Sequence, residues 1–304
     1  MVFLLSCSSG KIQEKDPLYG TRGLTINFIR GIPPSQVYEG DQIDIGIELS
    51  NEGSYPITRG FYNLITENQY VSINNMGYEK DFIGEYPMQG KTLFSQKGDK
   101  KQLSILANIG DVESFSGIDT NLVVQACYEY MTNLSTEVCI DTNQYDNSYE
   151  KPCKVKTLTF SGEGAPISIT KVEPRISTRI NPLGEKIIIP QFILYIKKVQ
   201  QGEVINPNKL EEICGNGYVN DKDFGRLIVK GKLGNVPLKC EPGTEEKPLL
   251  LSQNYGEEFQ GNTVRCLLDN EIQKKEGTYT SILNIQLYYG FSIKTSKKLT
   301  ILNT

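Results

Sequence analysis

Apolar and polar residues alternate along many short stretches of this chain, and a period of two is the pattern of a half-buried β-strand. In the clearest stretch, Ile43, Ile45, Ile47 and Leu49 are separated by polar or small residues. Shorter apolar stretches at residues 24–26 and 167–169 begin each half of the chain. Gly, Asn, Asp and Pro between the stretches indicate turns. The pattern predicts an all-β protein built from sandwiches.

One strand pattern occurs twice. Residues 124–140 (VQACYEYMTNLSTEVCI) align without a gap with residues 285–301 (IQLYYGFSIKTSKKLTI), and the offset is 161 at both ends. Matched pairs include Gln125 with Gln286, Tyr128 with Tyr289, and Tyr130 with Phe291. In each copy, apolar residues alternate on both sides of a polar centre, at residues 133–135 and 294–296. We therefore predict a β-hairpin that closes each half.

The two halves also resemble each other at their starts, which defines the predicted organisation. Residues 192–196 alternate as residues 43–47 do, and aligning Gly202 with Gly53 gives an offset of 149. Because the offset at the end of each half is 161, the second half has about a dozen extra residues in its middle. A short helix is predicted there, at residues 206–215: Asn206 can cap it, Pro207 suits the first turn, and Gly215 can end it. The predicted units are an N-terminal tether at 1–22, a sandwich with an extra C-terminal strand at 23–160, a linker at 161–166 and a second sandwich at 167–304.

Composition limits the chemistry available to this chain. Its 304 residues have a formal charge of −4 and contain no histidine. Without histidine, Ser–His and Cys–His nucleophile pairs and His-ligated zinc sites are excluded. No basic surface for nucleic acid is expected. We predict no enzyme activity and no catalytic, cofactor or metal-binding residues. Residues 141–147 have alternate oxygen ligands loosely like a calcium loop, and residues 220–225 form a second acidic loop with a lysine between its carboxylates. We interpret both as ordinary loops and leave calcium binding open.

Seven cysteines include one near the N-terminus and six in the body of the chain. The six have no C-x-x-C spacing, which favours disulfides in an oxidising compartment over a metal site. Three lie in each half, so either one bridge joins the halves or each half keeps a free thiol. The preferred scheme is Cys127–Cys139, Cys153–Cys214 and Cys240–Cys266, with Cys139–Cys153 as the alternative. Asn133 begins a glycosylation sequon.

The first residues, MVFLLSCSSGK, place a short apolar stretch before Cys7 and a small polar tether after it. This resembles a bacterial-type lipobox and implies that Cys7 is lipidated and that the protein is a membrane-anchored lipoprotein outside the cytoplasm. The alternative is an N-terminus with an incidental cysteine. No apolar run has the roughly 18 residues that a membrane helix needs.

Residues 37–53 (VYEGDQIDIGIELSNEG) combine Gly-Asp, an alternating strand and Asn-x-Gly. This combination resembles CARDB-type and related immunoglobulin-like modules, which occur in tandem on uncharacterised archaeal and other prokaryotic cell-surface proteins. The resemblance covers both halves loosely, and the second half lacks the Asn-x-Gly. It implies two immunoglobulin-like sandwiches, a surface or adhesion setting and no catalytic residues.

The leading functional hypothesis is a cell-surface structural or interaction protein whose partners are other surface or membrane proteins or further copies of itself in an envelope or filament assembly. The alternative is a carbohydrate-binding sandwich protein, with a glycan as its partner. That alternative would use aromatic residues of the repeated segments, which are Tyr128, Tyr130, Tyr288, Tyr289 and Phe291. We predict instead that those on the inner face form the core and the others are ordinary outer-face strand residues.

Overall fold

The computed structural model describes residues 19–73, 80–84, 86–112, 116–143, 150–180, 182–184, 186–215, 220–251, 262–268, 272–273 and 277–303. Within these residues the chain is almost entirely β-structure. The strands of the first half are β1 (Leu24–Phe28), β2 (Gln36–Tyr38), β3 (Gln42–Asn51), β4 (Gly60–Ile65), β5 (Val71–Ile73), β6 (Lys80–Asp81), β7 (Lys100–Ile109), β8 (Ile118–Asp141) and β9 (Leu158–Thr159).

The second half begins at β10 and contains the helical segments. Its elements are β10 (Ile167–Ile180), β11 (Lys186–Lys198), β12 (Glu203–Ile205), the 3₁₀ turn η1 (Pro207–Lys209), helix α1 (Leu210–Cys214), the 3₁₀ turn η2 (Asp221–Asp223), β13 (Arg226–Leu233), β14 (Val236–Glu241), β15 (Leu249–Leu250), β16 (Thr263–Leu268), β17 (Ile272–Gln273) and β18 (Thr278–Leu302). Asn206 caps η1, Pro207 begins it and Gly215 ends α1, so the predicted helical segment is confirmed.

The first sandwich has the immunoglobulin arrangement, in which strands A, B, E and D form one sheet and C, F and G the other. Its first sheet has the order β1-β3-β7-β5, which matches A-B-E-D. Its second sheet has the order β4-β8-β18, which matches C-F-G, with β6 pairing β4 at one edge and β2 pairing β18 in parallel at the other. The G strand of this sandwich therefore comes from the end of the chain, not from the segment that follows β8.

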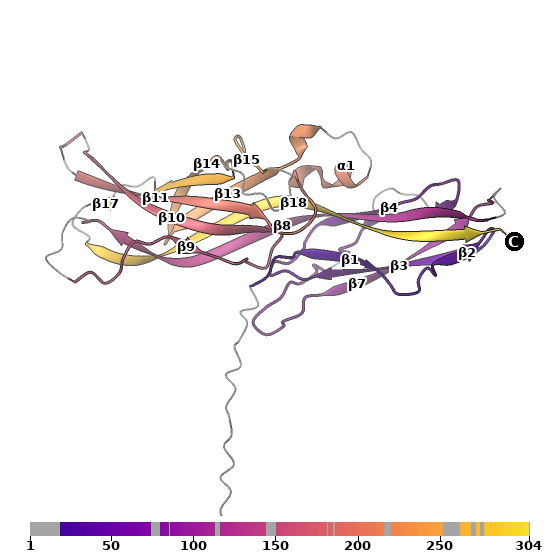
Figure 1. Ribbon diagram of the computed structural model, residues 1–304. Coiled ribbons are helices and arrows are strands. Elements are labelled where there is room, and N and C mark those ends of the chain that lie inside the picture. Colours follow the sequence, from indigo (N-terminus) through magenta and orange to yellow (C-terminus); the bar gives the residue numbers. More distant parts are fainter. Residues whose placement is uncertain are drawn as a thin grey trace, which may run out of the picture.

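The second sandwich repeats the strand order with the roles of the long strands reversed, and pairing of β13 with β14 joins its two sheets into one. The order β10-β11-β16-β14 matches A-B-E-D, and β13-β18-β8 matches C-F-G. Here β18 is strand F, and the second part of β8 supplies strand G. The two sandwiches thus exchange their last strands reciprocally, and Figure 1 shows β18 running from one end of the body to the other. The predicted fold class, all-β with two immunoglobulin-like sandwiches and one short helix in the second, is confirmed.

The predicted hairpins are wrong. β8 and β18 are unbroken strands of 24 and 25 residues that pair with each other antiparallel along their whole length. Glu129 pairs with Gly290, and these two positions are also equivalent in the repeat because their numbers differ by 161. A pseudo-two-fold axis therefore passes through this pair. Residues 133–135, predicted as a hairpin centre, lie within the strand, with Asn133 and Ser135 exposed and Leu134 buried.

A single hydrophobic core runs through both sandwiches, with residues of β1, β3, β8, β10, β11 and β18 in one continuous cluster. The long strands cause this continuity, because their inner faces contribute side chains to both halves. The segment after β8 adds to it: β9 pairs with β10, so the tail of the first half extends a sheet of the second. The domain boundary at residues 161–166 stays a prediction.

The structure joins the six cysteines in pairs that differ in part from the preferred scheme. Cys127 is bonded to Cys214, Cys139 to Cys153 and Cys240 to Cys266. The preferred Cys127–Cys139 and Cys153–Cys214 bridges do not occur, because Cys127 lies on the outer face of β8 beneath α1 rather than opposite Cys139. One bridge still joins the halves, since Cys127 belongs to β8 and Cys214 to the helix inserted in the second half. Cys7 lies outside the described residues.

Candidate functional site

Four aromatic residues meet in the core around the pseudo-two-fold axis. Tyr128 and Tyr130 of β8 lie beside Phe291 and Tyr289 of β18, with ring centroids 5.6 to 6.4 Å apart and mostly edge-to-face geometry. All four side chains are at most 2% exposed. They are therefore core residues, as predicted, and cannot form a sugar-stacking face. Tyr288 differs, because it lies on the opposite, outer face of the sheet.

The buried tyrosine hydroxyls form hydrogen bonds near the axis in each sandwich. Tyr128 accepts a hydrogen bond from the backbone N–H of Leu24 at 3.1 Å. Thr132 donates to the carbonyl of Ile167 at 2.6 Å, so the Tyr289 hydroxyl, 2.9 Å from the same Thr132 oxygen, donates to it. Burial raises the pKa of Tyr128 and Tyr289 well above the ordinary value, which keeps these hydroxyls protonated. Strands at the start of both halves are thus fixed to the long strands at the axis.

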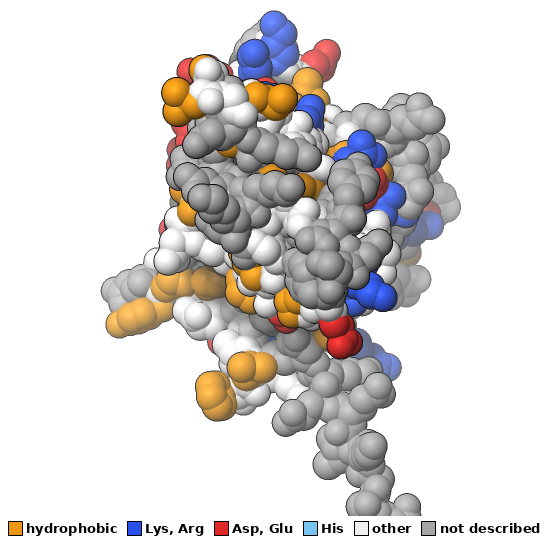
Figure 2. Space-filling view, turned by 90° about the vertical axis from the view of Figure 1, so that its left-hand side faces the viewer, with side chains coloured by type: hydrophobic (Ala, Val, Ile, Leu, Met, Phe, Trp, Pro, Cys, Tyr) orange, Lys and Arg blue, Asp and Glu red, His pale blue; other side chains and the backbone are white. Residues whose placement is uncertain are grey.

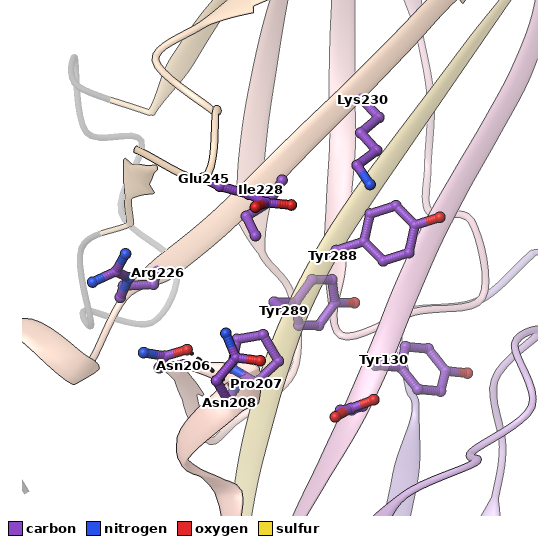
Figure 3. A pocket seen from close by; sticks show the side chains of 11 residues that line it. Tyr130, Asn206, Pro207, Asn208, Arg226, Ile228, Lys230, Glu245, Tyr288 and Tyr289 are labelled. Carbon is purple, nitrogen blue, oxygen red and sulfur yellow. Dashed lines mark hydrogen bonds between the residues drawn. The ribbon is translucent and has the colours of Figure 1, made fainter. Parts of the chain in front are cut away.

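A pocket of about 470 Å³ opens on the outer face near the same axis. It lies between the middle of β8 and β18, the first part of β13 and the segment that enters η1 (Figure 3). Most of its side chains are polar, and the apolar contributions on this face come from Ile228, Pro207 and the ring of Tyr288. The lining residues are Glu129, Tyr130, Asn206, Pro207, Asn208, Arg226, Ile228, Lys230, Glu245, Tyr288 and Tyr289.

Strand geometry explains why these groups converge. Side chains alternate between the faces of a strand, so Arg226, Ile228 and Lys230 of β13 lie on one face. In the register of the sheet, Ile228 is opposite Tyr288, and the Lys230 ammonium is 5.0 Å from the centre of the Tyr288 ring (Figure 3). This cation–π contact holds a positive charge against the aromatic wall of the pocket.

Glu129 supplies negative charge at the opposite wall. Its carboxylate forms an ion pair with Arg59 at 3.0 Å, and Arg59 also contacts Glu211 of α1 at 3.3 Å. The Arg59 guanidinium lies 5.7 Å from the Phe61 ring. The pocket therefore combines two carboxylates, from Glu129 and Glu245, with cations, side-chain amides and a tyrosine ring. Such a set can bind polar, hydroxyl-rich or zwitterionic groups. Among the described residues, no cluster of three His, Cys, Asp or Glu side chains has metal-binding geometry.

The Cys127–Cys214 disulfide fixes the helical wall of the pocket. Cys127, Ile205, Leu210, Ile213 and Cys214 form a small buried cluster, with Phe61 and Phe224 packed against it. This cluster contains residues of β4 and β8 as well as the helical insertion. The segment that bears Asn206 and Pro207 is consequently held against both sandwiches at once.

The two predicted acidic loops do not join this pocket. Asp141 forms an ion pair with Lys151 at 2.8 Å and accepts from Thr278 at 3.0 Å; residues 144–147 of that loop lie outside the described residues. Burial opposes the charged form of Asp141, but the hydrogen bonds from Lys151, the Asn143 N–H and Thr278 together outweigh it and lower the carboxyl pKa. In the other loop, Asn220 and Asp223 cap each other across η2, as expected for a turn.

Sequence reasoning missed the pocket residues on β13 and the Glu245 loop. The alternation in residues 226–232 (RLIVKGK) predicts a strand, and it could have placed Arg226 and Lys230 on one face. The pairing of β13 with β18, which brings them to Tyr288, is a long-range contact that no local pattern reveals. Asn133, the sequon residue, is exposed on the same outer face, opposite Gln286 in the register.

No protein-family model matches the chain, and no curated protein matches it in sequence. Among solved structures, it aligns with a serine-rich repeat adhesion glycoprotein (Srr1) from Streptococcus agalactiae at 11% identity, over 95% of this chain and 99% of that chain, with a TM-score of 0.17. It also aligns with the collagen adhesin (CNA) from S. aureus at 9% identity, over 93% and 92%, with a TM-score of 0.11. TM-scores this low establish neither a shared fold nor a shared function.

Proposed function

We propose that this chain is a non-enzymatic protein of the cell surface or envelope that holds itself or a partner in a fixed geometry. The reciprocal exchange of the last strand between the two sandwiches carries this proposal. Independent sandwiches joined by a linker reorient freely unless their interface is large and apolar. Here 24 residues of β8 pair with β18 across both sandwiches, so bending at the junction would break backbone hydrogen bonds.

Three disulfides support a location outside the cytoplasm, because such bonds persist in oxidising compartments. The likeness of residues 37–53 to CARDB-type modules of archaeal and other prokaryotic surface proteins supports the same setting. Within the described residues, no helix has the length and apolarity of a membrane span.

We extend the proposal to a lipid anchor at Cys7. Tyr19, where the described chain begins, is twelve positions after Cys7, and a fully extended segment of that length reaches about 40 Å. The lipobox-like residues around Cys7 support this anchor. Mature lipoproteins carry several acyl chains, which a stable anchor requires, because a single chain binds a membrane only reversibly.

Fractionation of cells that express the full chain tests location and anchoring together. We expect the protein in the envelope fraction, cleaved by protease added to intact cells and released by detergent but not by salt. Cys7→Ser should release it into the soluble extracytoplasmic fraction without changing its disulfides. Recovery from the cytosol with all cysteines open to alkylation would contradict the proposal.

Carbohydrate binding is the second candidate, and the pocket beside Tyr288 favours it. A tyrosine ring surrounded by amides and charged groups suits the apolar face and the hydroxyls of a sugar. Glycan-array binding by the wild-type protein should be lost in Tyr288→Ala. Tyr195→Ala is the matched control, since Tyr195 also lies beneath a lysine, Lys171, at 3.6 Å, but on β11 away from the pocket. Equal loss in both variants, or no binding by the wild type, would reject this candidate.

A further inference from the structure

The loop that precedes β7 exposes two adjacent large apolar side chains. Phe94 is 100% exposed and Leu93 is 75% exposed. Both are flanked in sequence by lysines, Lys91 and Lys97. Figure 2 shows hydrophobic side chains standing out from the lower part of the molecule in that view. Contiguous exposed apolar surface can serve as a contact with a partner or a membrane.

Hydrogen bonds hold this turn in a defined shape. The Thr92 N–H donates to the Ser95 carbonyl at 2.8 Å, and the Thr92 hydroxyl accepts from the N–H groups of Phe94 and Ser95 at 3.3 and 3.0 Å. The Ser95 hydroxyl donates to the Lys97 carbonyl at 2.7 Å. The turn therefore holds Leu93 and Phe94 outward in a defined backbone conformation before any contact is made.

The turn lies close to the place where the described chain begins. At its base, the Lys91 N–H donates to the Gly53 carbonyl at 2.7 Å, and the next residue, Ser54, donates to Gly164 at 2.8 Å. Gly164 in turn donates to the carbonyl of Gly20 at 2.9 Å. Hydrogen bonds through residues 53–54 and Gly164 thus link Lys91 to Gly20. Figure 1 shows the loop before β7 at the lower edge of the body, near the start of the first strand.

We infer that the turn at residues 91–97 is a membrane-contact site that places Leu93 and Phe94 in the interface of an anionic bilayer. The anchor proposed at Cys7 would bring the bilayer to this side of the molecule, and the inference rests on that proposal for its setting in the cell. Lysines at both ends of the turn complement anionic headgroups, while the two apolar side chains leave water. Anchor and turn together would fix the orientation of the rigid body above the membrane.

Tryptophan fluorescence tests the contact directly, because the chain has no tryptophan of its own. Phe94→Trp introduces a single reporter at the turn, and Leu250→Trp introduces one at an apolar position on β15 that is 64% exposed. With phosphatidylglycerol-containing vesicles, the Phe94→Trp emission should move to shorter wavelength and be quenched by brominated lipids. The Leu250→Trp emission should stay unchanged. Phosphatidylcholine vesicles should give a weaker response, because they lack the anionic headgroup.

Chemical coupling of Cys7 to a lipid tests the membrane contact independently of the proposed native lipid anchor. The other six cysteines are paired in disulfides, so maleimide-bearing lipids can couple the full unlipidated chain at Cys7. Quenching of coupled Phe94→Trp supports the contact even if native Cys7 carries no lipid. Absence of quenching in the coupled protein overturns the inference while leaving the anchor intact.

Affinity measurements give a second readout on uncoupled protein. Leu93→Ser combined with Phe94→Ser should weaken binding to anionic vesicles about tenfold or more, whereas Leu250→Ser should not change it. Circular dichroism should show the same fold in all variants, since these side chains make no core contacts. Equal vesicle affinity in the wild type and the double variant would instead assign the turn to a protein partner and overturn the membrane site.

Discussion

Glu163 lies in the segment between β9 and β10, and its side chain is buried although it is a carboxylic acid. Only 7% of the residue is exposed, one carboxyl oxygen accepts from the Ile169 N–H at 3.2 Å, and the other has no hydrogen-bond partner. Burial raises the pKa of Glu163 from 4.5 to about 7. Below pH 4.5 the group is protonated whether or not the protein is folded, so it does not affect stability there.

Stability should therefore fall as the pH rises from 4.5 to 7, where the unfolded chain releases this proton and the folded chain retains it. The loss is about 3 kcal/mol and is complete above pH 7. Glu163→Gln mimics the protonated acid, so it should raise the free energy of unfolding at pH 8 and change it little at pH 4.5. Urea titrations at both pH values measure this, with exposed Glu137→Gln as the control. A gain independent of pH would contradict the burial argument.

The buried tyrosine hydroxyls allow a second prediction at the residue scale. Tyr128→Phe leaves the buried N–H of Leu24 without an acceptor, which costs about 1 to 3 kcal/mol. Tyr289→Phe leaves no buried group without a hydrogen-bond partner, because Thr132 keeps its bond to the Ile167 carbonyl. This substitution should lower the free energy of unfolding by about 1 kcal/mol or less. Denaturant unfolding of the two variants should therefore rank Tyr128→Phe as the more damaging. The reverse order would mean that the Leu24 N–H finds water.

Among the elements, the disulfides differ in the length of chain they close. Cys127 and Cys214 are 87 residues apart, whereas Cys139 and Cys153 are 14 apart. In the chain-entropy model, closing the longer loop contributes about 4 to 5 kcal/mol of stability, and closing the shorter loop contributes about 3 kcal/mol. Replacing both cysteines of the first pair by alanine should thus lower the midpoint of denaturation more than replacing those of the second. It should also speed amide exchange in α1, which that bridge holds to β8.

The long strands show how far sequence could predict this fold. Alternation identified β3 and β11, and the repeat identified residues that are equivalent across the pseudo-two-fold axis. The hairpins were predicted because polar residues such as Asn133 and Ser135 suggested a turn. In fact the alternation keeps its phase through Leu134, as a continuous strand requires. The 24 residues of β8 instead pair throughout with the second copy of the repeat, in β18.

The pocket could not be predicted from the sequence for a related reason. Its walls come from β8, β13, β18 and the helical insertion, and pairing across distant parts of the chain brings them together. Cys127 was assigned to Cys139 because the supposed hairpin would have placed them face to face. Once β8 is straight, Cys127 and Cys139 are twelve residues apart along one strand, and the cysteine near Cys127 is the one in α1.

At the scale of the whole molecule, strand exchange predicts that neither sandwich is complete without the other half of the chain. A protease site inserted between Lys156 and Thr157, in an exposed stretch, would cut the chain without removing either long strand. After cleavage in a reductant, which opens the Cys127–Cys214 bridge, the fragments 1–156 and 157–304 should still elute together by size exclusion and unfold in one transition. Their association rests on the β8–β18 ladder and the shared core. Two tandem sandwiches with closed hairpins would instead separate into two folded monomers, so elution at half the mass, with native dichroism in each fragment, is the result that strand exchange forbids.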